Sequence, residues 1–497
     1  MRSRSLLFLA GLVAVSGVIG CRAREVPGDG SPPGVVLLII DTLRWDALSP
    51  RADGTPRVPS LSRFAAEGVT FTEASATAPW TLPSIASALS GLLPRRHGAQ
   101  LAFNDAAMRR VPPGVVMLAE VFEANGWSTA ACTAGGWVAP ELGLGTGFDQ
   151  FTTNFDLHDP EFFLEPWEAK RPKDRPFFLM LHTGAPHDPY GDKDLPIRLQ
   201  CRPNPEVKEV ARKLVASLDA GQPVDDLLYA DFVATRTSDP CSRKAIDLLL
   251  GPSRTATLMG PYNQWMAGGW QRAPSANLPT RMRTAYERGL AYVDRRIDHT
   301  LKTLDSLGLP KDTVFMVVAD HGESFGEHGH LYHGQSMHDA VLKVPFVIRA
   351  PKRLPAGRVV RDGCSLVDVM PTLLDLAGLG DVVPAGIDGR SLVPVASGTS
   401  AGHAAIAEGE VVGTGSAPLG LVSVRTPQAK WVLAYDLPSG QHRSEEIYDL
   451  VTDPDEHAPL PALDTKPFGV EFCRAVDRMR SEIAARYGQM PQPPSCP

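Results

Sequence analysis

Histidines and carboxylates are concentrated in one segment of this chain, residues 319–334, which reads ADHGESFGEHGHLYHG. Five of the 13 histidines fall between positions 321 and 338. Asp320 and His321 stand side by side there, and a carboxylate next to an imidazole suits a divalent cation. The interspersed glycines let the backbone turn tightly around such an ion. The segment therefore predicts a metal site, and the alternative is a polar surface loop whose histidines are hydrogen-bonded locally.

Other residues of the metal-ligand type recur where apolar runs of the chain end. Asp41 directly follows the run Val35–Ile40. His182 directly follows Phe177–Leu181, and His187 lies a few residues further on. Because ligands of open parallel sheets bind beyond the carboxyl ends of the strands, we expect these side chains to converge with the histidine-rich segment.

A threonine stands at the start of a predicted helix and could act as a nucleophile. Thr81 precedes Pro83 and the helix-like run Ser84–Leu89, which Gly91 would end. A hydroxyl at this place faces the positive end of the helix, whose free N–H groups favour an anionic sulfuryl or phosphoryl group. A nearby cation would lower the pKa of the hydroxyl, and attack would give a covalent threonine ester. The alternative is that Thr81 or Ser84 only caps the helix.

Several further residues have two readings that the sequence leaves open. Arg44 could bind an anionic substrate or pair with Asp46. His182 could face the substrate or a metal, or could be a hydrogen-bonded histidine at a strand end. Trp80 and Trp137 could wall the pocket or lie in the core. Groups that could support the site or hold a second metal are Glu323, His328 and His338.

The elements that must position these residues follow from the pattern of apolar runs. Val35–Ile40 (VVLLII) has apolar residues on both faces, which is typical of a buried parallel strand. Similar runs are Ser128–Cys132, Phe177–Leu181, Val314–Val318 and Pro345–Ile348. Amphipathic stretches between them are Pro59–Ala66, Val116–Ala124 and Thr284–Leu307. This alternation predicts an α/β fold with a mostly parallel central sheet and helices on both faces.

Seven motifs in a fixed order now identify a family. They are Val36–Leu48 (VLLIIDTLRWDAL), Thr77–Gly98 (TAPWTLPSIASALSGLLPRRHG), Phe177–Tyr190 (FFLMLHTGAPHDPY), Val317–Gly334, Val369–Leu379 (VMPTLLDLAGL), Ile387–Leu392 (IDGRSL) and Ile447–Glu456 (IYDLVTDPDE). Together they resemble the sulfatase family within the alkaline-phosphatase superfamily. The resemblance runs from residue 34 to residue 460 and implies an alkaline-phosphatase/sulfatase-like fold.

The resemblance also implies roles for individual residues. Metal-ligand positions are matched by Asp41, Asp320 and His321. Thr81 matches the nucleophile, His187 a histidine that acts on the leaving group or the substrate oxygens, and His333 a histidine that binds substrate or a second metal. Oxygen-rich ligands suit calcium or magnesium, whereas His321 with further histidines would suit zinc or manganese.

Three positions depart from the sulfatase pattern. Thr81 replaces the cysteine or serine that sulfatases convert to formylglycine, Ile85 replaces an arginine, and Thr42 replaces the second acidic ligand. A threonine nucleophile is what phosphodiesterases and phosphoethanolamine transferases of this superfamily use. We therefore expect a metal-dependent hydrolase of sulfate, phosphate or phosphonate esters. The alternatives are a phosphoethanolamine-type transferase and a degenerate protein that binds an anionic glycan or lipid at the cell surface.

The two ends of the chain predict export and a small second subdomain. Arg2 and Arg4 precede the apolar run Leu6–Val15, and the segment ending in Cys21 resembles a bacterial lipobox, which implies cleavage and lipidation at Cys21. This would make the protein a membrane-anchored lipoprotein on the periplasmic or cell-surface side. The expected parts are a signal peptide (1–20), a tether (21–33), a catalytic domain (34–402) with an insertion or lid (193–279), and a small antiparallel C-terminal subdomain (403–497).

Charge and cysteine content limit the remaining possibilities. The net charge is −7 without a long basic run, which argues against nucleic acid as a partner. The cysteines show no paired CxxC spacing of a zinc site. Export permits disulfides, and the pairs that bound one local segment each are Cys201 with Cys241 and Cys473 with Cys496.

Overall fold

The computed structural model describes residues 34–100, 110–153, 157, 159–188, 190, 205–238, 240–267, 277–411, 418–437 and 439–488. Lipidation of Cys21, the signal peptide and the tether lie outside these residues, as do Cys201 and Cys496. Cys473 is disulfide-bonded. Among the described residues, no helix combines the length and the hydropathy needed to cross a membrane.

An eight-stranded sheet forms the centre of the fold, with the strand order β10-β2-β9-β6-β1-β5-β3-β4. Every residue of β1, β3, β5 and β6 is buried, as their two-sided apolar sequences predict. The strands are β1 (Val35–Ile40), β2 (Val69–Ser75), β3 (Ser128–Cys132), β4 (Gln150–Thr152), β5 (Phe177–Thr183), β6 (Val314–Ala319), β9 (Phe346–Arg349) and β10 (Arg358–Ser365).

One strand of this sheet runs against the others. β9 is antiparallel to both β6 and β2, whereas the remaining neighbours pair in parallel. The sequence interpretation of Pro345–Ile348 as one more parallel strand was therefore wrong. The chain leaves β6 at the carboxyl edge and returns from that same edge as β9, without the helical crossover that a parallel strand needs. The predicted fold class, a mostly parallel sheet, is confirmed.

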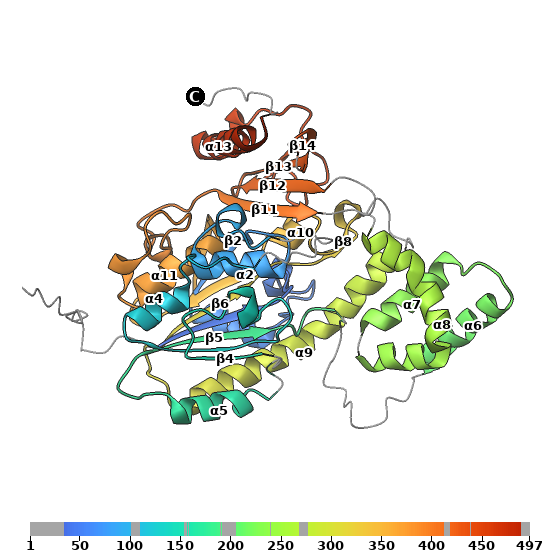
Figure 1. Cartoon of the computed structure of the whole chain (residues 1–497), viewed down its shortest axis with the longest axis horizontal. Coiled ribbons are helices and arrows are strands. Elements are labelled where there is room, and N and C mark those ends of the chain that lie inside the picture. The colour runs from blue at the N-terminus through green and yellow to red at the C-terminus, as the bar shows by residue number, and fades with distance from the viewer. Residues whose placement is uncertain are drawn as a thin grey trace, which may run out of the picture. The chain divides into compact units, whose positions relative to one another are not determined.

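Helices cover both faces of the sheet (Figure 1): α2, α4 and α11 lie on one face, and α5 and α9 on the other. All residues of α2 are buried, so this helix belongs to the core rather than to the surface. The helices are α1 (Pro59–Ala66), α2 (Thr81–Ser90), α3 (Pro94–His97), α4 (Leu118–Ala124), α5 (Glu161–Lys170), α9 (Leu278–Ser306), α10 (Asp339–Leu342), α11 (Val369–Leu376) and α12 (Val393–Ser397). Short 3₁₀ turns are η1 (Trp45–Leu48), η2 (Pro140–Leu142), η3 (Glu327–Gly329), η4 (Leu366–Asp368), η5 (Gly380–Val382) and η6 (Lys466–Phe468).

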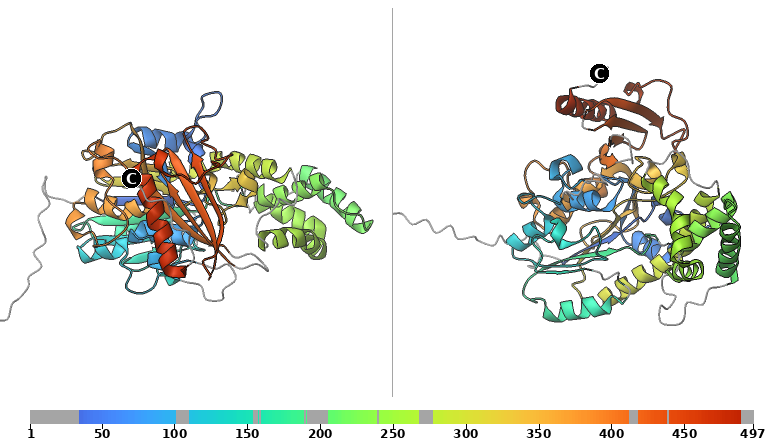
Figure 2. Two further views of the ribbon diagram at one scale, coloured as in Figure 1. Left: turned by 90° about the horizontal axis from the view of Figure 1, so that it is seen from above. Right: turned by 45° about the vertical axis from the view of Figure 1, so that its right-hand side comes forward.

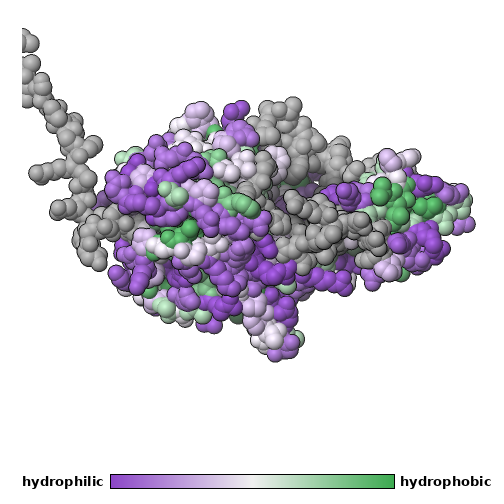
Figure 3. All heavy atoms as spheres, turned by 90° about the horizontal axis from the view of Figure 1, so that it is seen from below, coloured by the Kyte–Doolittle hydropathy of each residue, from purple (hydrophilic) through white to green (hydrophobic). Residues whose placement is uncertain are grey.

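The predicted insertion is helical where the structure describes it. It forms α6 (Pro205–Asp219), α7 (Asp226–Ser238) and α8 (Pro240–Ala267), and α8 is interrupted at Gly251, where φ is 75°. These helices pack on one another and on the first half of α9, which continues beneath the sheet (Figure 1). Figure 3 shows apolar side chains gathered at this end of the molecule. Exposed leucines of α7 and α8 are Leu227, Leu248 and Leu249.

The C-terminal part forms a separate antiparallel sheet with one helix against it (Figure 2). Its strands are β11 (Ala405–Val411), β12 (Leu419–Arg425), β13 (Ala429–Asp436) and β14 (His442–Asp449), and its helix is α13 (Val470–Tyr487). Trp431 and Phe472 are fully buried between the sheet and α13. The small antiparallel C-terminal sheet predicted from the sequence is therefore confirmed. A two-stranded hairpin of β7 (Ser324–Phe325) and β8 (Leu331–Tyr332) completes the fold.

Candidate active site and metal-binding residues

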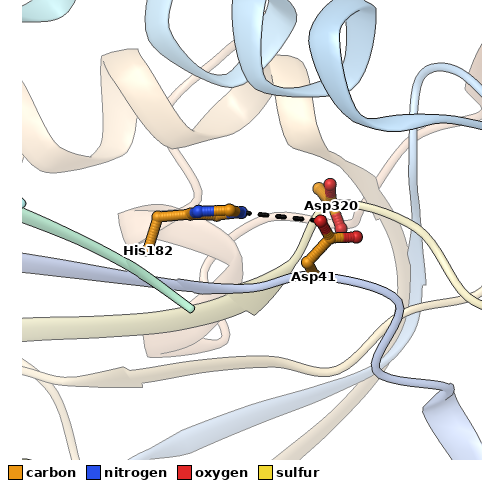
Figure 4. Close-up of side chains that lie close together, drawn as sticks. All are labelled: Asp41, His182 and Asp320. Carbon is orange, nitrogen blue, oxygen red and sulfur yellow. Dashed lines mark ion pairs between the residues drawn. The ribbon is translucent and has the colours of Figure 1, made fainter. Parts of the chain in front are cut away.

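Three neighbouring strands bring the predicted ligand residues together at the carboxyl edge of the sheet. β5, β1 and β6 are adjacent and in register, so the ends of the three strands lie side by side. Asp41 follows β1, Asp320 follows β6, and His182 belongs to the end of β5. Each offers one ligand atom within 4.8 Å of the other two, and all three side chains are buried (Figure 4). No other cluster of the described residues has this metal-ligand geometry.

Among the described residues, only histidines lie beside the two buried carboxylates of this cluster. Asp41 Oδ1 and Asp320 Oδ2 accept no hydrogen bond from the described residues, and no described lysine or arginine pairs with either group. Burial and the neighbouring Asp41 raise the pKa of Asp320 well above its usual value. Burial alone would also raise the pKa of Asp41, but the imidazoles of His187 and His321 lower it. Two buried carboxylates with open oxygens fit a divalent cation.

His321 is prepared to act as a neutral ligand. Its Nδ1 donates a proton to the carbonyl oxygen of Gly322 at 2.9 Å, which leaves the Nε2 lone pair free to face the site. Nε2 lies 3.5 Å from Asp41 Oδ1 and 3.5 Å from Asp320 Oδ2. Burial and the neighbouring His333 lower the pKa of His321 to about 3, so the imidazole of His321 is neutral at pH 7.

His182 has the opposite tautomer and therefore suits a different task. Its Nδ1 accepts a hydrogen bond of 3.4 Å from the backbone N–H of Ala134. The proton of a neutral ring is then on Nε2, which lies 3.8 Å from Asp41 Oδ2. Although Nε2 is close enough to the carboxylates to join a metal cluster, an N–H group there favours steadying Asp41 or a substrate oxygen over coordinating a cation.

Thr81 is the first residue of α2 and points into the same site. Its hydroxyl Oγ1 lies 3.2 Å from His321 Nε2, and its side chain is buried. The N-cap residue, Trp80, is extended and makes no side-chain cap hydrogen bond. Ser84, the other hydroxyl near the start of the helix, is bound to the backbone of Ala78 through both its oxygen and its proton. Of the two hydroxyls, only that of Thr81 faces the ligand cluster.

Two further histidines complete one wall of the site. The ring of His333 lies 4.5 Å from that of His321 and 5.1 Å from that of His187, measured between ring centroids. His187 Nδ1 lies 3.0 Å from the backbone oxygen of Asp188 and 3.1 Å from its carboxylate. Burial alone would lower the pKa of His187, but the Asp188 hydrogen bond and the charges of Asp41 and Asp188 raise it to about 10. His187 is therefore protonated and positively charged at neutral pH, and it can act as a proton donor.

A buried glutamate orients His333, and the sequence indicates this role only weakly. Glu323 is fully buried, and its Oε1 accepts the Nδ1 proton of His333 at 3.0 Å. Its second oxygen accepts the hydroxyl proton of Tyr190 at 3.1 Å. Glu323 was named from the sequence as one of three groups that could support the site. Tyr190 was not identified as a functional residue, and the only indication in the sequence is its place at the end of the Phe177–Tyr190 motif.

Arg44 is engaged by protein groups rather than open to the site. Its Nε and Nη2 donate to the two oxygens of Asp46 at 3.1 Å each, and Nη1 donates to the backbone oxygen of Glu323 and to Glu327. The pairing with Asp46 that the sequence left open is therefore present. Through the Glu323 carbonyl, Arg44 steadies the segment that carries the site.

Not all the histidines of the rich segment belong to this site. His328 and His338 stack on each other with ring centroids 3.5 Å apart, and His338 Nε2 lies 3.4 Å from the hydroxyl of Tyr448 on β14. These two histidines thus contact the C-terminal sheet, and neither belongs to the metal-ligand cluster. Trp80 is buried, whereas the Trp137 side chain is 39% exposed and packs edge-on against it.

Comparison with known proteins gives one consistent result. The family model described as Sulfatase matches residues 33–379. An endo-4-O-sulfatase of Bacteroides thetaiotaomicron is 23% identical over 511 residues, covering 93% of this chain and 95% of the relative. A solved structure in complex with its substrate, D-glucosamine-2-N,6-O-disulfate, superposes with a TM-score of 0.62 at 20% identity, covering 92% of this chain and 98% of that one. The phosphonate monoester hydrolase of Agrobacterium radiobacter superposes with a TM-score of 0.59 at 19% identity, covering 92% and 96%. The chain belongs to the sulfatase family of ester hydrolases.

Proposed function

We propose that this protein hydrolyses a sulfate, phosphate or phosphonate ester through a covalent intermediate on Thr81. The observation that carries the proposal is the position of the Thr81 hydroxyl, 3.2 Å from His321 Nε2, beside two buried carboxylates that each have an oxygen without a hydrogen-bond partner. A hydroxyl at the positive end of a buried helix is well placed to attack an anionic ester group held there.

The residues that would hold a divalent metal are Asp41, Asp320 and His321. A bound divalent cation would lower the pKa of a nearby hydroxyl and neutralise the negative charge that develops on the ester oxygens. The carboxylate oxygens suit calcium or magnesium, and the neutral Nε2 of His321 would also suit zinc or manganese. The open oxygens of Asp41 and Asp320 support this assignment.

The remaining groups divide the chemistry between them. Thr81 Oγ1 forms a bond to sulfur or phosphorus and releases its proton to solvent, while the bond to the leaving alcohol breaks. His187, a cation at neutral pH, gives its proton to the oxygen that leaves. Water then bonds to the phosphorus or sulfur while the bond to Thr81 Oγ1 breaks. Neutral His187 takes a proton from that water, and Thr81 Oγ1 takes a proton back from solvent. His333, oriented by Glu323, and His182, through its Nε2–H, would steady the charged oxygens.

The nucleophile favours phosphorus esters among the possible substrates. Thr81 cannot be converted to the formylglycine of sulfatases, and the similar structures include a phosphonate monoester hydrolase. Similarity to an endo-4-O-sulfatase and to a structure holding a sulfated glucosamine supports a sugar ester as the substrate. The proposal also includes export and lipid anchoring at Cys21, as the N-terminal sequence predicts.

A panel of four esters tests the proposal on purified, metal-analysed protein: 4-nitrophenyl sulfate, 4-nitrophenyl phosphate, bis(4-nitrophenyl) phosphate and a 4-nitrophenyl phosphonate. We expect turnover of at least one ester, loss of that turnover in Thr81→Ala, and partial turnover in Thr81→Ser, which keeps a hydroxyl. Unchanged turnover in Thr81→Ala would refute the nucleophile. Absence of turnover together with absence of bound metal in the wild type would favour a degenerate binding protein.

A further inference from the structure

A tight turn at the carboxyl edge of the sheet presents an exposed tryptophan. The turn follows β3, and a bridge between Gly135 and Val138 closes it. The Thr133 hydroxyl donates to the Val138 carbonyl at 2.7 Å, and Gly135 and Gly136 adopt positive φ, as the reversal of the chain requires. Trp137 follows these glycines and keeps 39% of its side-chain surface exposed.

Two separate contacts attach this turn to the candidate active site. The N–H of Ala134 donates to His182 Nδ1, and the Nε2 of the same ring faces Asp41. The ring of Trp137 meets that of buried Trp80 at an interplanar angle of 84°, with centroids 5.6 Å apart. Trp80 directly precedes the proposed nucleophile, Thr81. Trp137 is therefore fixed at the rim between the residue before Thr81 and the histidine beside Asp41.

The exposure of this ring needs a reason, because a large aromatic side chain gains stability from burial. Trp137 is also held in place before any ligand arrives, since Trp80 braces its ring and hydrogen bonds close the turn. A ligand that packs on the indole therefore loses little free energy in ordering this side chain. An exposed, braced indole at the rim of an anion site is suited to stacking against a second ring.

We propose that Trp137 is a specificity-determining residue, the platform on which a ring in the alcohol part of the ester stacks. This inference rests on the proposed function, because it assigns the alcohol part of the ester that Thr81 would attack. The indole face packs against the C–H face of a pyranose or the face of an aryl ring. The anionic group would then lie at Thr81, while the ring rests at the rim.

Three esters of the same acid test the assignment, with the acid chosen as the one the wild type accepts. They are the ethyl ester, which carries no ring, the 4-nitrophenyl ester, and the 6-ester of methyl glucoside. Each is assayed with the wild type, Trp137→Ala and Trp137→Phe. Phe162→Ala serves as the matched control, because this side chain of α5 is 72% exposed and lies outside the site.

We expect Trp137→Ala to raise KM about tenfold for the ring esters, to leave kcat within about twofold, and to leave both constants unchanged for the ethyl ester. Trp137→Phe should recover most of the loss, and Phe162→Ala should match the wild type. A KM change for the sugar ester alone assigns a pyranose, and a change for the aryl ester alone assigns an aryl group.

Two outcomes would overturn the inference, and they differ from each other. If Trp137→Ala affects all three esters equally, or none, Trp137 is no ring platform although the proposed hydrolysis stands. If the wild type turns over no ester, the proposed function fails and this inference fails with it.

Discussion

Two buried clusters of acidic groups in this molecule differ in what balances their charge. At the junction with the C-terminal sheet, Asp339 pairs with Arg425 at 2.8 Å and with Lys430 at 2.7 Å, and Lys430 also pairs with Glu456 at 2.8 Å. At the carboxyl edge of the central sheet, Asp41 and Asp320 have only imidazoles beside them among the described residues. The closest of these is His321, at 3.5 Å from each carboxylate.

The comparison separates a structural cluster from one that awaits a ligand. Burial would raise the pKa of Asp339, but the charges of Arg425 and Lys430 hold it well below its usual range. The pKa of Asp320 is raised, because burial and Asp41 both oppose its charge. The chain thus supplies lysine and arginine to one cluster, whereas the other has only histidines and stays suited to a cation from outside.

Removing one acid from each cluster should have opposite consequences for stability. The largest effect of all is expected on ester turnover, at the carboxyl edge of the central sheet. We expect Asp320→Asn to lower kcat/KM by about 10³-fold or more, because the site loses the charge that would hold a cation. The same change should leave the metal-free protein at least as stable as the wild type, since it removes repulsion between two buried carboxylates. Ester turnover and thermal unfolding in chelator measure the two effects, and clear destabilisation of the metal-free variant would contradict the comparison.

At the structural cluster, Asp339→Asn should lower the free energy of unfolding by about 3–5 kcal/mol, because Arg425 and Lys430 would stay buried without their counter-charge. Denaturant unfolding monitored by tryptophan fluorescence measures this. Glu209→Gln is the control, since this glutamate and its partner Arg212 are both exposed. Equal stability of the two variants would mean that the buried network contributes no more than a surface pair.

The same network predicts a pH dependence with a definite sign. A carboxyl whose pKa is depressed by folding stabilises the native state above its ordinary pKa, and this contribution is lost as pH falls towards the folded value. The difference in unfolding free energy between wild type and Asp339→Asn should therefore be full at pH 7 and smaller at about pH 3, below the ordinary carboxyl pKa. A difference that grows as the pH falls would contradict the ion-pair assignment.

A smaller effect is expected from the glutamate that orients His333. Glu323→Gln should lower kcat by about 10–100-fold with metal content unchanged, because the His333 ring loses the carboxylate that fixes its tautomer. Tyr190→Phe, which removes the other hydrogen bond to Glu323, should lower kcat a few-fold. The pH profile of kcat should shift in Glu323→Gln and not in Tyr190→Phe. If the two variants behave alike, Glu323 does not act through His333.

Much of the fold was predictable because its central strands are buried on both faces. Apolar residues on both faces make β1, β3, β5 and β6 recognisable in the sequence. The ligand residues at the strand ends were expected because ligands of parallel sheets bind beyond the carboxyl ends of the strands. β9 has the same apolar composition, but its direction depends on the loop before it, which composition does not reveal. The insertion was not predicted to be helical, although α6 and α7 contain no glycine or interior proline and α6 is amphipathic. Only α8 is interrupted, at Gly251.

The residue types of the site were predictable from the sequence, but the role of each residue was less so. The sequence placed Asp41, Thr81 and Asp320 at element ends, where the structure brings them together. It could not assign the tautomers of His182 and His321, because these depend on backbone partners, Ala134 and Gly322. Similarly, the segregation of His328 and His338 depends on Tyr448, which lies more than a hundred residues further along the chain.

Metal content, measured by inductively coupled plasma mass spectrometry, tests the central claim most directly. Wild type, Asp320→Asn and Asp294→Asn are compared after identical purification. Asp294 is the matched control, a buried carboxylate that instead accepts backbone N–H groups at the start of α1. We predict about one divalent ion per chain in the wild type and in Asp294→Asn, and less than about a tenth of that in Asp320→Asn. A full complement of metal in Asp320→Asn, or an active wild type that holds none, would contradict the account.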